Sequence, residues 1–469
     1  MKKIFYIKNN LLVYLLLGLL FSLGGCKKLL QADLSNSAIT STQVFTSDAT
    51  ALSAVDGIYA YMALFTGPQY LTDDGIGAIT SIGADDLLDY TQTYADYQTN
   101  TISSSGTLSP VYNVWRNGYK DIYLTNAAIE GISASSAISA AVKSQLLGEC
   151  YVIRAFNYFY LTNLYGDLPL TTSTTYQQNS TQGKAPADEV YKQIIADLQL
   201  AETMLPATYP SADRARPNKY TAAALLAKVY LYNKQWALAE AQASTVIQSG
   251  LYTLVQNTDN VFLKTSTETI WQLAPVGSKN NTNSYLQYTP TATNGPTFTL
   301  TTGLLSSFEV NPVTNTPDKR RGSWIGSIVY NTNTYYYPAK YKAKSSAANV
   351  EDNILFRMAE QYLIRAEARA QQNNADGAIA DLNIIRNRAG LGNTTAVLQA
   401  DLLAAISREN RIEYFAEWGH RWFDLKRTGT IDAVLGAAKT TYKPFAKLWP
   451  LPQTEILANP NLIQNTGYN

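Results

Sequence analysis

The sequence is poor in cysteine and histidine and carries almost no net charge. Its 469 residues include two cysteines, Cys26 and Cys150, and one histidine, His420. This scarcity disfavours a disulfide framework, a metal site built from Cys or His, and Ser-His-Asp or Cys-His chemistry not centred on His420. The formal net charge of +1 lacks the basic excess typical of nucleic-acid binding. The sequence has neither a P-loop nor a dinucleotide-binding fingerprint, so we expect no cofactor.

Tyrosine is the residue type that stands out. There are 33 tyrosines against 13 phenylalanines. A tyrosine offers a flat apolar ring and a hydroxyl group, which together suit uncharged, hydroxylated ligands. We expect most of these tyrosines to cover helices and a few to contact a ligand.

The N-terminus has the order of a secretory signal. A basic start, Met1-Lys2-Lys3, precedes a leucine-rich run that is too short to span a bilayer. The run ends at Leu23-Gly24-Gly25-Cys26, which resembles a bacterial lipobox. We therefore expect residues 1–25 to be a lipoprotein signal peptide and Cys26 to carry the lipid that holds the protein at a membrane. Loss of Lys2, Lys3 and Lys8 would give a mature charge of +1 − 3 = −2. The alternative is an ordinary signal peptide with a chance cysteine.

Most of the remaining chain has helical periodicity. Apolar residues at helical spacing, capping residues and breakers predict helices over 47–64, 111–132, 139–164 and 188–205. Two further pairs of helices are predicted over 220–250 and 356–390. Ala227 and Ala239 in the first pair, and Ala366 and Ala378 in the second, are each twelve residues apart. Small residues in this register let antiparallel helices pack closely, so both pairs resemble tetratricopeptide units.

Two segments lack this periodicity. Residues 66–110 are rich in breakers, including Asp73-Asp74-Gly75, which we interpret as a turn. Residues 251–350 are rich in Gly, Pro, Asn and Thr and contain strand-like runs at Thr269–Leu273 and Ile328–Tyr330. A long irregular insert usually serves a function, so we expect the binding residues in these two segments.

Several blocks, in order, resemble the SusD/RagB lipoproteins of Bacteroidetes. The most specific is Arg408-Glu409-Asn410-Arg411-Ile412-Glu413-Tyr414-Phe415, followed by Glu417-Trp418-Gly419-His420-Arg421-Trp422-Phe423-Asp424. Further blocks are Arg154–Phe159 with Leu164–Leu170, Arg357–Ala368, Asn383–Gly390 and Leu448–Pro452. Together with the lipobox, they cover nearly the whole mature chain.

The resemblance implies a mostly α, SusD-like fold in which tetratricopeptide-like hairpins hold a loop-rich binding region, with residues 26–469 as a single domain. It also implies a lipid-anchored, outward-facing outer-membrane protein that is not an enzyme. Such proteins bind oligosaccharides and deliver them to a SusC-type TonB-dependent transporter.

The charged residues near the C-terminus invite a catalytic interpretation, which we weigh against a structural one. Glu413 and Glu417 could be the paired carboxylates of a glycoside hydrolase. They lie at i and i+4 of a predicted helix, close to Arg408 and Arg411, so we favour a structural ion network. We also expect His420 to pack or cap. Asp85, Asp86 and Asp89 lack the spacing of a calcium loop, and we expect capping or solvent exposure there.

For binding we favour aromatic residues in loops over those on helices, because sugar rings stack on indole and phenol rings. Trp324 is the leading candidate. The other candidates are Tyr335, Tyr336, Tyr337, Tyr94, Tyr97, Tyr285 and Tyr288. The other six tryptophans are predicted to be core residues. Alternative functions are peptide uptake and a tetratricopeptide-type protein scaffold.

Overall fold

The computed structural model describes residues 44–64, 67, 70–277, 280–344 and 348–468. The predicted signal peptide and Cys26 lie outside the described residues. Residues 45–469 pack as one unit, and the description below concerns that unit.

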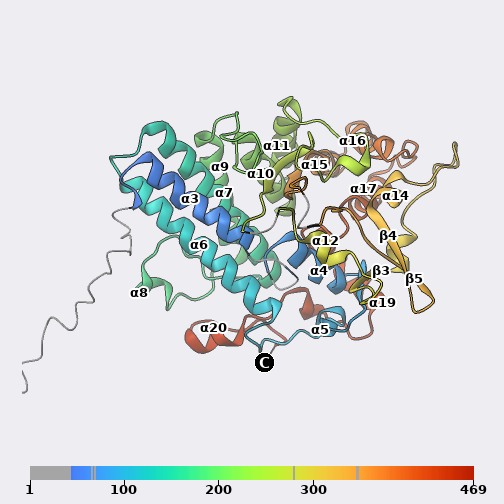
Figure 1. Ribbon diagram of the computed structural model, residues 1–469, viewed down its shortest axis with the longest axis horizontal. Coiled ribbons are helices and arrows are strands. Elements are labelled where there is room, and N and C mark those ends of the chain that lie inside the picture. The colour runs from blue at the N-terminus through green and yellow to red at the C-terminus, as the bar shows by residue number, and fades with distance from the viewer. Residues whose placement is uncertain (1–43, 65–66, 68–69, 278–279, 345–347, 469) are drawn as a thin grey trace, which may run out of the picture. The chain divides into compact units, whose positions relative to one another are not determined.

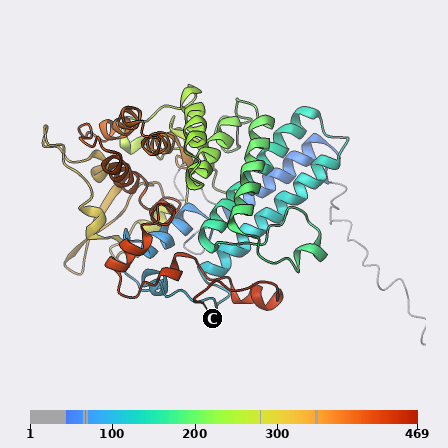
Figure 2. The ribbon, with the colours of Figure 1, turned by 180° about the vertical axis from the view of Figure 1, so that it is seen from behind.

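Long helices form the N-terminal half, as the periodicity predicted (Figures 1 and 2). They are α3 (Asp48–Leu64), α6 (Pro110–Ala134), α7 (Ala140–Tyr165) and α9 (Ala187–Met204). Arg154 of α7 joins three of them: its guanidinium pairs with Asp197 of α9 at 2.7 Å and donates to Asn126 of α6 at 2.8 Å. Cys150 is a free, buried residue of α7, as expected.

The two predicted helical pairs follow in the chain and pack on each other. They are α10 (Lys219–Tyr232) with α11 (Trp236–Gln248), and α15 (Met358–Gln371) with α16 (Ala375–Arg388). The four alanines of the predicted register are fully buried. In the second pair, Arg365 and Asp381 bridge the two helices at 2.7 Å. The predicted helices and their close packing are confirmed.

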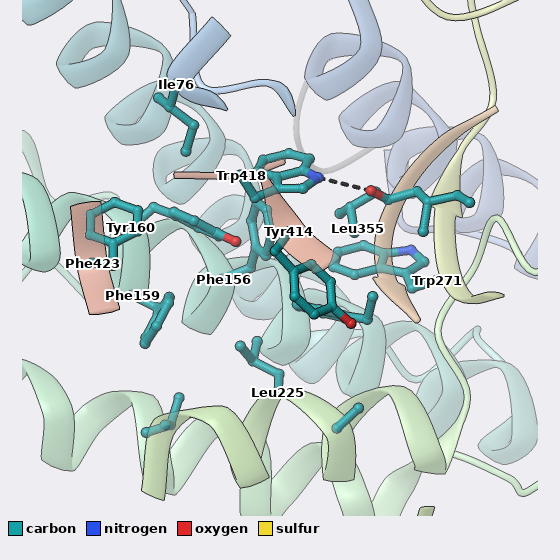
Figure 3. Close-up of a cluster of buried hydrophobic side chains, with 14 of the residues drawn as sticks. Ile76, Phe156, Phe159, Tyr160, Leu225, Trp271, Leu355, Tyr414, Trp418 and Phe423 are labelled. Carbon is teal, nitrogen blue, oxygen red and sulfur yellow. Dashed lines mark hydrogen bonds between the residues drawn. The ribbon is translucent and has the colours of Figure 1, made fainter. Parts of the chain in front are cut away.

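A cluster of buried aromatic side chains joins α7 to parts of the chain that are distant in sequence (Figure 3). The rings of Phe156 and Trp418 lie 5.3 Å apart, and Phe156 also meets Trp271 at 5.5 Å. Trp418 donates its indole N–H to the carbonyl of Ile354 at 2.8 Å. The five tryptophans 115, 271, 418, 422 and 449 are buried, as predicted, whereas Trp236 is half-buried.

The segment 66–110 is more ordered than its breakers suggested. It contains α4 (Asp73–Gly83), a helix whose described side chains are all buried. The interpretation of Asp73-Asp74-Gly75 as a turn was wrong, because these residues form the first turn of α4. Asp73 accepts the backbone N–H of Trp418 at 2.9 Å, and Asp74 accepts the side-chain amide of Asn283 at 2.8 Å. These two hydrogen bonds compensate for the burial of the carboxylates. The partners lie far away in the sequence, so local sequence does not reveal them.

Among the described residues, three small antiparallel sheets lie in or beside the irregular segments. Strand β1 (Leu87–Asp89) pairs with β3 (Phe298–Leu300), and β2 (Thr269–Leu273) pairs with β6 (Asn353–Arg357). Strands β4 (Ile325–Tyr330) and β5 (Asn333–Pro338) form a hairpin. The strand-like run at Thr269–Leu273 is confirmed, and the run at Ile328–Tyr330 is the end of β4.

Further helices, most of them short, complete the unit. They are α5 (Ala95–Gln98), α8 (Tyr176–Asn179), η2 (Thr258–Asn260), α12 (Ser284–Tyr288), α13 (Thr302–Leu305), α14 (Lys319–Trp324), α17 (Gln399–Tyr414), α18 (His420–Arg427), α19 (Ile431–Ala438), η3 (Pro444–Lys447) and α20 (Gln453–Ala458). The part of the chain that the structure describes contains no helix with both the length and the apolar character needed to cross a membrane.

A buried ion network ties α14 to α16, α17 and the end of β6. At its centre Glu413 pairs with Arg320 at 2.9 Å, with Arg357 at 2.5 Å and with Arg388. Glu417 also pairs with Arg357, at 3.0 Å. Both glutamates are buried and satisfied by arginines, so they offer no accessible carboxylate pair to a ligand. The structural interpretation of this motif is therefore supported over the glycosidase one.

Two details of that motif differ from expectation. Arg411 pairs with Asp86 at 2.7 Å instead of with a nearby glutamate, and Arg408 approaches Glu309 at 3.5 Å. Asp85 pairs with both Arg411 and Arg421, so solvent exposure of the aspartate cluster was a wrong prediction. The two aspartates lie more than 300 residues from their arginine partners in sequence, which explains why spacing could not identify these pairs.

His420 is buried and stacks on Tyr414, with ring centroids 4.2 Å apart. Burial lowers the pKa of His420 well below its ordinary value, and neighbouring cations lower it further. The residue is therefore a neutral packing residue at pH 7, as expected from the sequence.

Candidate functional site

The β4–β5 hairpin sorts its tyrosines onto two faces. A two-residue loop at Asn331 and Thr332, both with positive φ, joins the strands and fixes the pairing of Tyr330 with Asn333. Side chains alternate along each strand, so Tyr330, Tyr335 and Tyr337 share one face. Tyr336 points to the other face and is exposed. The three consecutive tyrosines cannot all contact one ligand.

The first face of the hairpin meets Tyr90, which directly follows β1. The rings of Tyr90 and Tyr335 are 5.1 Å apart at 70°, and those of Tyr90 and Tyr330 are 6.3 Å apart at 86°. Both pairs have the edge-to-face geometry that aromatic rings prefer. The pKa of Tyr90 is raised, first by a hydrogen bond with Tyr335 and then by partial desolvation. We call Tyr90, Tyr330 and Tyr335 the tyrosine cluster.

Glycines allow the neighbouring rings to lie close to the backbone. Tyr330 covers Gly295, where a methyl group would come within 2.7 Å of the ring. Tyr337 covers Gly326, its cross-strand partner, in the same way. A side chain at either glycine would displace a ring, so the glycines help set the orientation of this face.

A groove of about 620 Å³ lies beside β1. Leu88 lines it and is exposed, and Tyr90 lies two residues further along the same extended segment. The backbone N–H of Tyr90 donates to the carbonyl of Thr297, which continues the β1–β3 pairing by one residue. Side chains two residues apart on an extended strand point to the same side, so Leu88 and Tyr90 do so. The groove and the tyrosine cluster are therefore neighbours along one strand.

The groove combines an apolar part, which includes Leu87 and Leu88, with hydroxyl and amide groups. Its lining includes Gln98, Thr99, Thr301, Thr302, Thr440 and Thr441. Lys439 also lines it, but its ammonium donates to the carbonyls of Ile82 and Gly83 at 2.7 and 2.6 Å, at the end of α4. Burial lowers the pKa of Lys439 to about 7. Asp85 also lines the groove and pairs with Arg411 and Arg421. The charged groups of the lining are therefore bonded to other parts of the protein, which leaves the groove suited to an uncharged polar ligand.

Five of the predicted binding tyrosines have accessible surface. Tyr335 belongs to the tyrosine cluster, Tyr337 and Tyr285 are half-buried, and Tyr336 is exposed on the opposite face. Tyr94 is half-buried and stacks on Phe298 at 6.3 Å. Tyr285 lies near Tyr337, since it contributes to the raised pKa of that tyrosine after the larger effect of burial. For Tyr335, Tyr337, Tyr285 and Tyr94 a binding role remains a prediction, whereas Tyr336 faces away from the tyrosine cluster and we expect it to contribute little.

The leading candidate, Trp324, was a wrong prediction. Its side chain has no exposed surface. The indole N–H donates to the carbonyl of Thr258 at 2.9 Å, and Lys340 lies 4.9 Å from the ring centre. A sugar cannot stack on this ring, because other residues of the protein already cover it. Trp324 instead fixes the end of α14, from which β4 begins.

Tyr97 and Tyr288 are also buried and cannot serve as stacking platforms. The hydroxyl of Tyr97 accepts the backbone N–H of Val111 at 3.1 Å, and its ring packs on Trp449. Tyr288 packs on Phe298 with ring centres 6.2 Å apart. Both are therefore packing residues of the core.

Sequence reasoning did not select Tyr90 and Tyr330. The useful signal was the hairpin: a turn at Asn331 and Thr332 places Tyr330 and Tyr335 on one face. Tyr90 carries no comparable signal, because its contact with the hairpin joins segments about 240 residues apart and depends on the tertiary fold.

Comparison with known families gives two matches along the chain. Residues 170–468 match the model described as "SusD family", which is more than half of the chain. Residues 80–231 match a related model described as "Starch-binding associating with outer membrane". Among curated proteins, SusD-like protein P25 of Formosa agariphila is 24% identical over 98% of this chain and 99% of its own length.

Solved structures share the fold over most of the chain. A SusD superfamily protein from Bacteroides vulgatus superposes with a TM-score of 0.78 at 20% identity, covering 90% of this chain and 100% of that one. A laminarin-binding SusD-like protein gives a TM-score of 0.73 at 21% identity, with the same coverage. The surface glycan-binding protein A of Bacteroides fluxus gives 0.75 at 21% identity, again covering 90% and 100%. At these identities the structural likeness establishes the mostly helical fold.

Proposed function

The chain belongs to the SusD family, and from that premise we propose that it binds oligosaccharides at an outer membrane through the tyrosine cluster. The observation that carries this proposal is the pair of rings Tyr90 and Tyr335, held in fixed geometry with Tyr90 39% exposed. Phenol rings present faces for the C–H groups of a sugar, and the adjoining groove supplies hydroxyl and amide partners for sugar hydroxyls. Two solved relatives are named for laminarin and glycan binding, which supports the same ligand class.

The ring pair gives a direct test. We expect the double substitution Tyr90→Ala and Tyr335→Ala to weaken oligosaccharide binding by about tenfold or more, or about 1.4 kcal/mol, because it removes both stacking surfaces. Isothermal titration against glycans first identified on an array would measure the loss, and thermal unfolding would report stability.

Tyr336→Ala is the matched control. Tyr336 is 37% exposed, close to the 39% of Tyr90, but it lies on the opposite face of the hairpin. Its removal should leave affinity unchanged. Equal losses for the control and the double variant, or binding to peptides instead of glycans on parallel arrays, would contradict the proposal.

We further propose that the protein is lipid-anchored through Cys26, faces the cell exterior, and passes its ligand to a SusC-type TonB-dependent transporter. The lipobox-like sequence before Cys26 and the family's described association with the outer membrane support this arrangement. Affinity purification of the tagged chain from native membranes should recover a transporter in an amount about equal to that of the tagged chain. A Cys26→Ala variant should no longer be found in the membrane fraction. Recovery of the wild-type chain without any transporter would count against the partnership.

A further inference from the structure

A second aromatic groove lies on another part of the unit. It has a volume of about 550 Å³ and is bordered by α6, by the segment that carries α8, and by α20. In both ribbon views, α8 and α20 lie far from the β4–β5 hairpin (Figures 1 and 2). The groove shares no lining residue with the tyrosine cluster or with the groove beside β1.

One face of α6 supplies the main wall of the groove. Arg116, Tyr119, Lys120 and Tyr123 follow one another at spacings of three, one and three residues, which places them on the same side of a helix. Tyr123 is 47% exposed, and Tyr176, across the groove on α8, is 76% exposed. Within the described ranges neither ring pairs with another aromatic ring. Packing does not account for these two large exposed rings.

The opposite wall is held in place by hydrogen bonds. Tyr119 donates its hydroxyl to the carbonyl of Pro169 at 2.8 Å, and Glu130 accepts the backbone N–H of Thr174 at 2.8 Å. On the C-terminal side, Asn459 donates its amide to the carbonyl of Gln182 at 2.9 Å. The segment carrying Tyr176 is therefore tied to α6 and to the end of the chain. A groove with fixed walls loses little freedom when a ligand enters.

The charges in the groove are mostly positive and unpaired. Arg116 and Lys120 are exposed, and neither forms an ion pair with an acid in the part of the chain described. Lys120 lies 5.2 Å from the ring centre of Tyr123. The one lining carboxylate, Glu455, has its pKa raised by burial and accepts a hydrogen bond from Trp115. The exposed rim is thus cationic, and the carboxylate lies further in as an acceptor.

We infer that this groove is a second saccharide site, specific for oligosaccharides that bear carboxylate or sulfate groups. Tyr123 and Tyr176 provide ring faces for the sugar. Arg116 and Lys120 bind its acidic groups, and Glu455 accepts a hydrogen bond from one of its hydroxyl groups. The site stands independently of the tyrosine cluster, because it uses none of the same residues.

The test uses the full-length chain and three hexasaccharides: hexagalacturonate for carboxylates, a κ-carrageenan hexasaccharide for sulfates, and neutral maltohexaose. At least one acidic probe should bind with an affinity that falls as salt is raised, because the rim charges are exposed. Tyr123→Ala with Tyr176→Ala should weaken that binding by about tenfold or more. Arg116→Gln with Lys120→Gln should weaken it to a similar degree and remove most of the salt dependence.

Two control variants show whether acidic saccharides bind in this groove or elsewhere on the protein. Lys192→Gln with Lys342→Gln removes two exposed cations outside the groove and should leave binding of the acidic probe unchanged. Tyr90→Ala with Tyr335→Ala should also retain it, so failure of the proposed glycan function and failure of this site give different results. The inference is overturned if no acidic probe binds, if the groove variants bind as well as wild type, or if maltohexaose binding is lost equally.

Discussion

Glu413→Ala is expected to lower the free energy of unfolding by about 3–5 kcal/mol, because it leaves buried arginines without their shared partner. Glu413 has no exposed surface and pairs with Arg320, Arg357 and Arg388. A loss of this size is a large fraction of the stability of an ordinary protein. Urea denaturation followed by far-ultraviolet circular dichroism would measure it.

The effect should depend on pH in a defined direction. Burial raises the pKa of Glu413, but Arg388, Arg357 and Arg320 outweigh it and hold the pKa well below its ordinary value. A carboxylate with a lowered folded pKa stabilises the protein above its unfolded pKa of about 4.3 and loses that contribution as the pH falls through the folded value. The advantage of wild type over the near-isosteric Glu413→Gln should therefore be constant above pH 5 and shrink by up to about 1.4 kcal/mol per pH unit in more acidic solution.

Glu189→Ala is the matched surface control. Glu189 pairs with Lys192 at 2.7 Å, but both side chains are more than half exposed. Exposed pairs are screened by water and salt, and an acid in the first turn of a helix adds little more, so this variant should unfold within about 1 kcal/mol of wild type. If Glu413→Ala unfolds no more easily than Glu189→Ala, the network contributes nothing to the fold and its structural role is wrong.

The helices of this protein could be predicted from the sequence because their signals are local. Apolar spacing and breakers placed α6, α7, α9 and the two helical hairpins to within a few residues. The alanine register also predicted which helix faces would meet. A helix satisfies its backbone within one segment, so its limits are determined by neighbouring residues.

The helix α4 could not be predicted in the same way. It begins with two aspartates and includes three glycines, a composition that usually marks a turn. The helix exists because its polar first turn finds partners in Trp418 and Asn283, which are distant in sequence. Tertiary contacts thus overrode local propensity.

The candidate site lies in the segments that the sequence indicated, but it includes only some of the residues that the sequence indicated. The choice of aromatic residues in irregular segments identified Tyr335 and its neighbourhood. It failed for Tyr97, Tyr288 and Trp324, because composition does not distinguish a buried ring from an exposed one. The hairpin register would have separated Tyr335 from Tyr336, whereas the contact with Tyr90 required the fold.

Trp324→Ala is expected to destabilise the protein by about 3–5 kcal/mol, as is usual when a large buried side chain is removed. The ring packs on Phe262 at 5.6 Å, lies beside Lys340, and its indole N–H satisfies the carbonyl of Thr258. Because α14 ends at Trp324 and β4 begins at the next residue, the cavity should also loosen the base of the hairpin that carries Tyr330 and Tyr335. Oligosaccharide binding should then fall together with the melting temperature.

Trp324→Phe separates the ring from its hydrogen bond. It keeps most of the apolar contact but leaves the Thr258 carbonyl without this donor, a loss of about 1–3 kcal/mol. We expect it to be intermediate in melting temperature and to bind nearly as well as wild type. Loss of binding at an unchanged melting temperature in Trp324→Ala would mean that the indole reaches the ligand, and the assignment of Trp324 as an anchor of the hairpin would fail. The two variants thus decide whether the tryptophan most suggestive of sugar binding acts on the ligand or on the strand that presents the tyrosines.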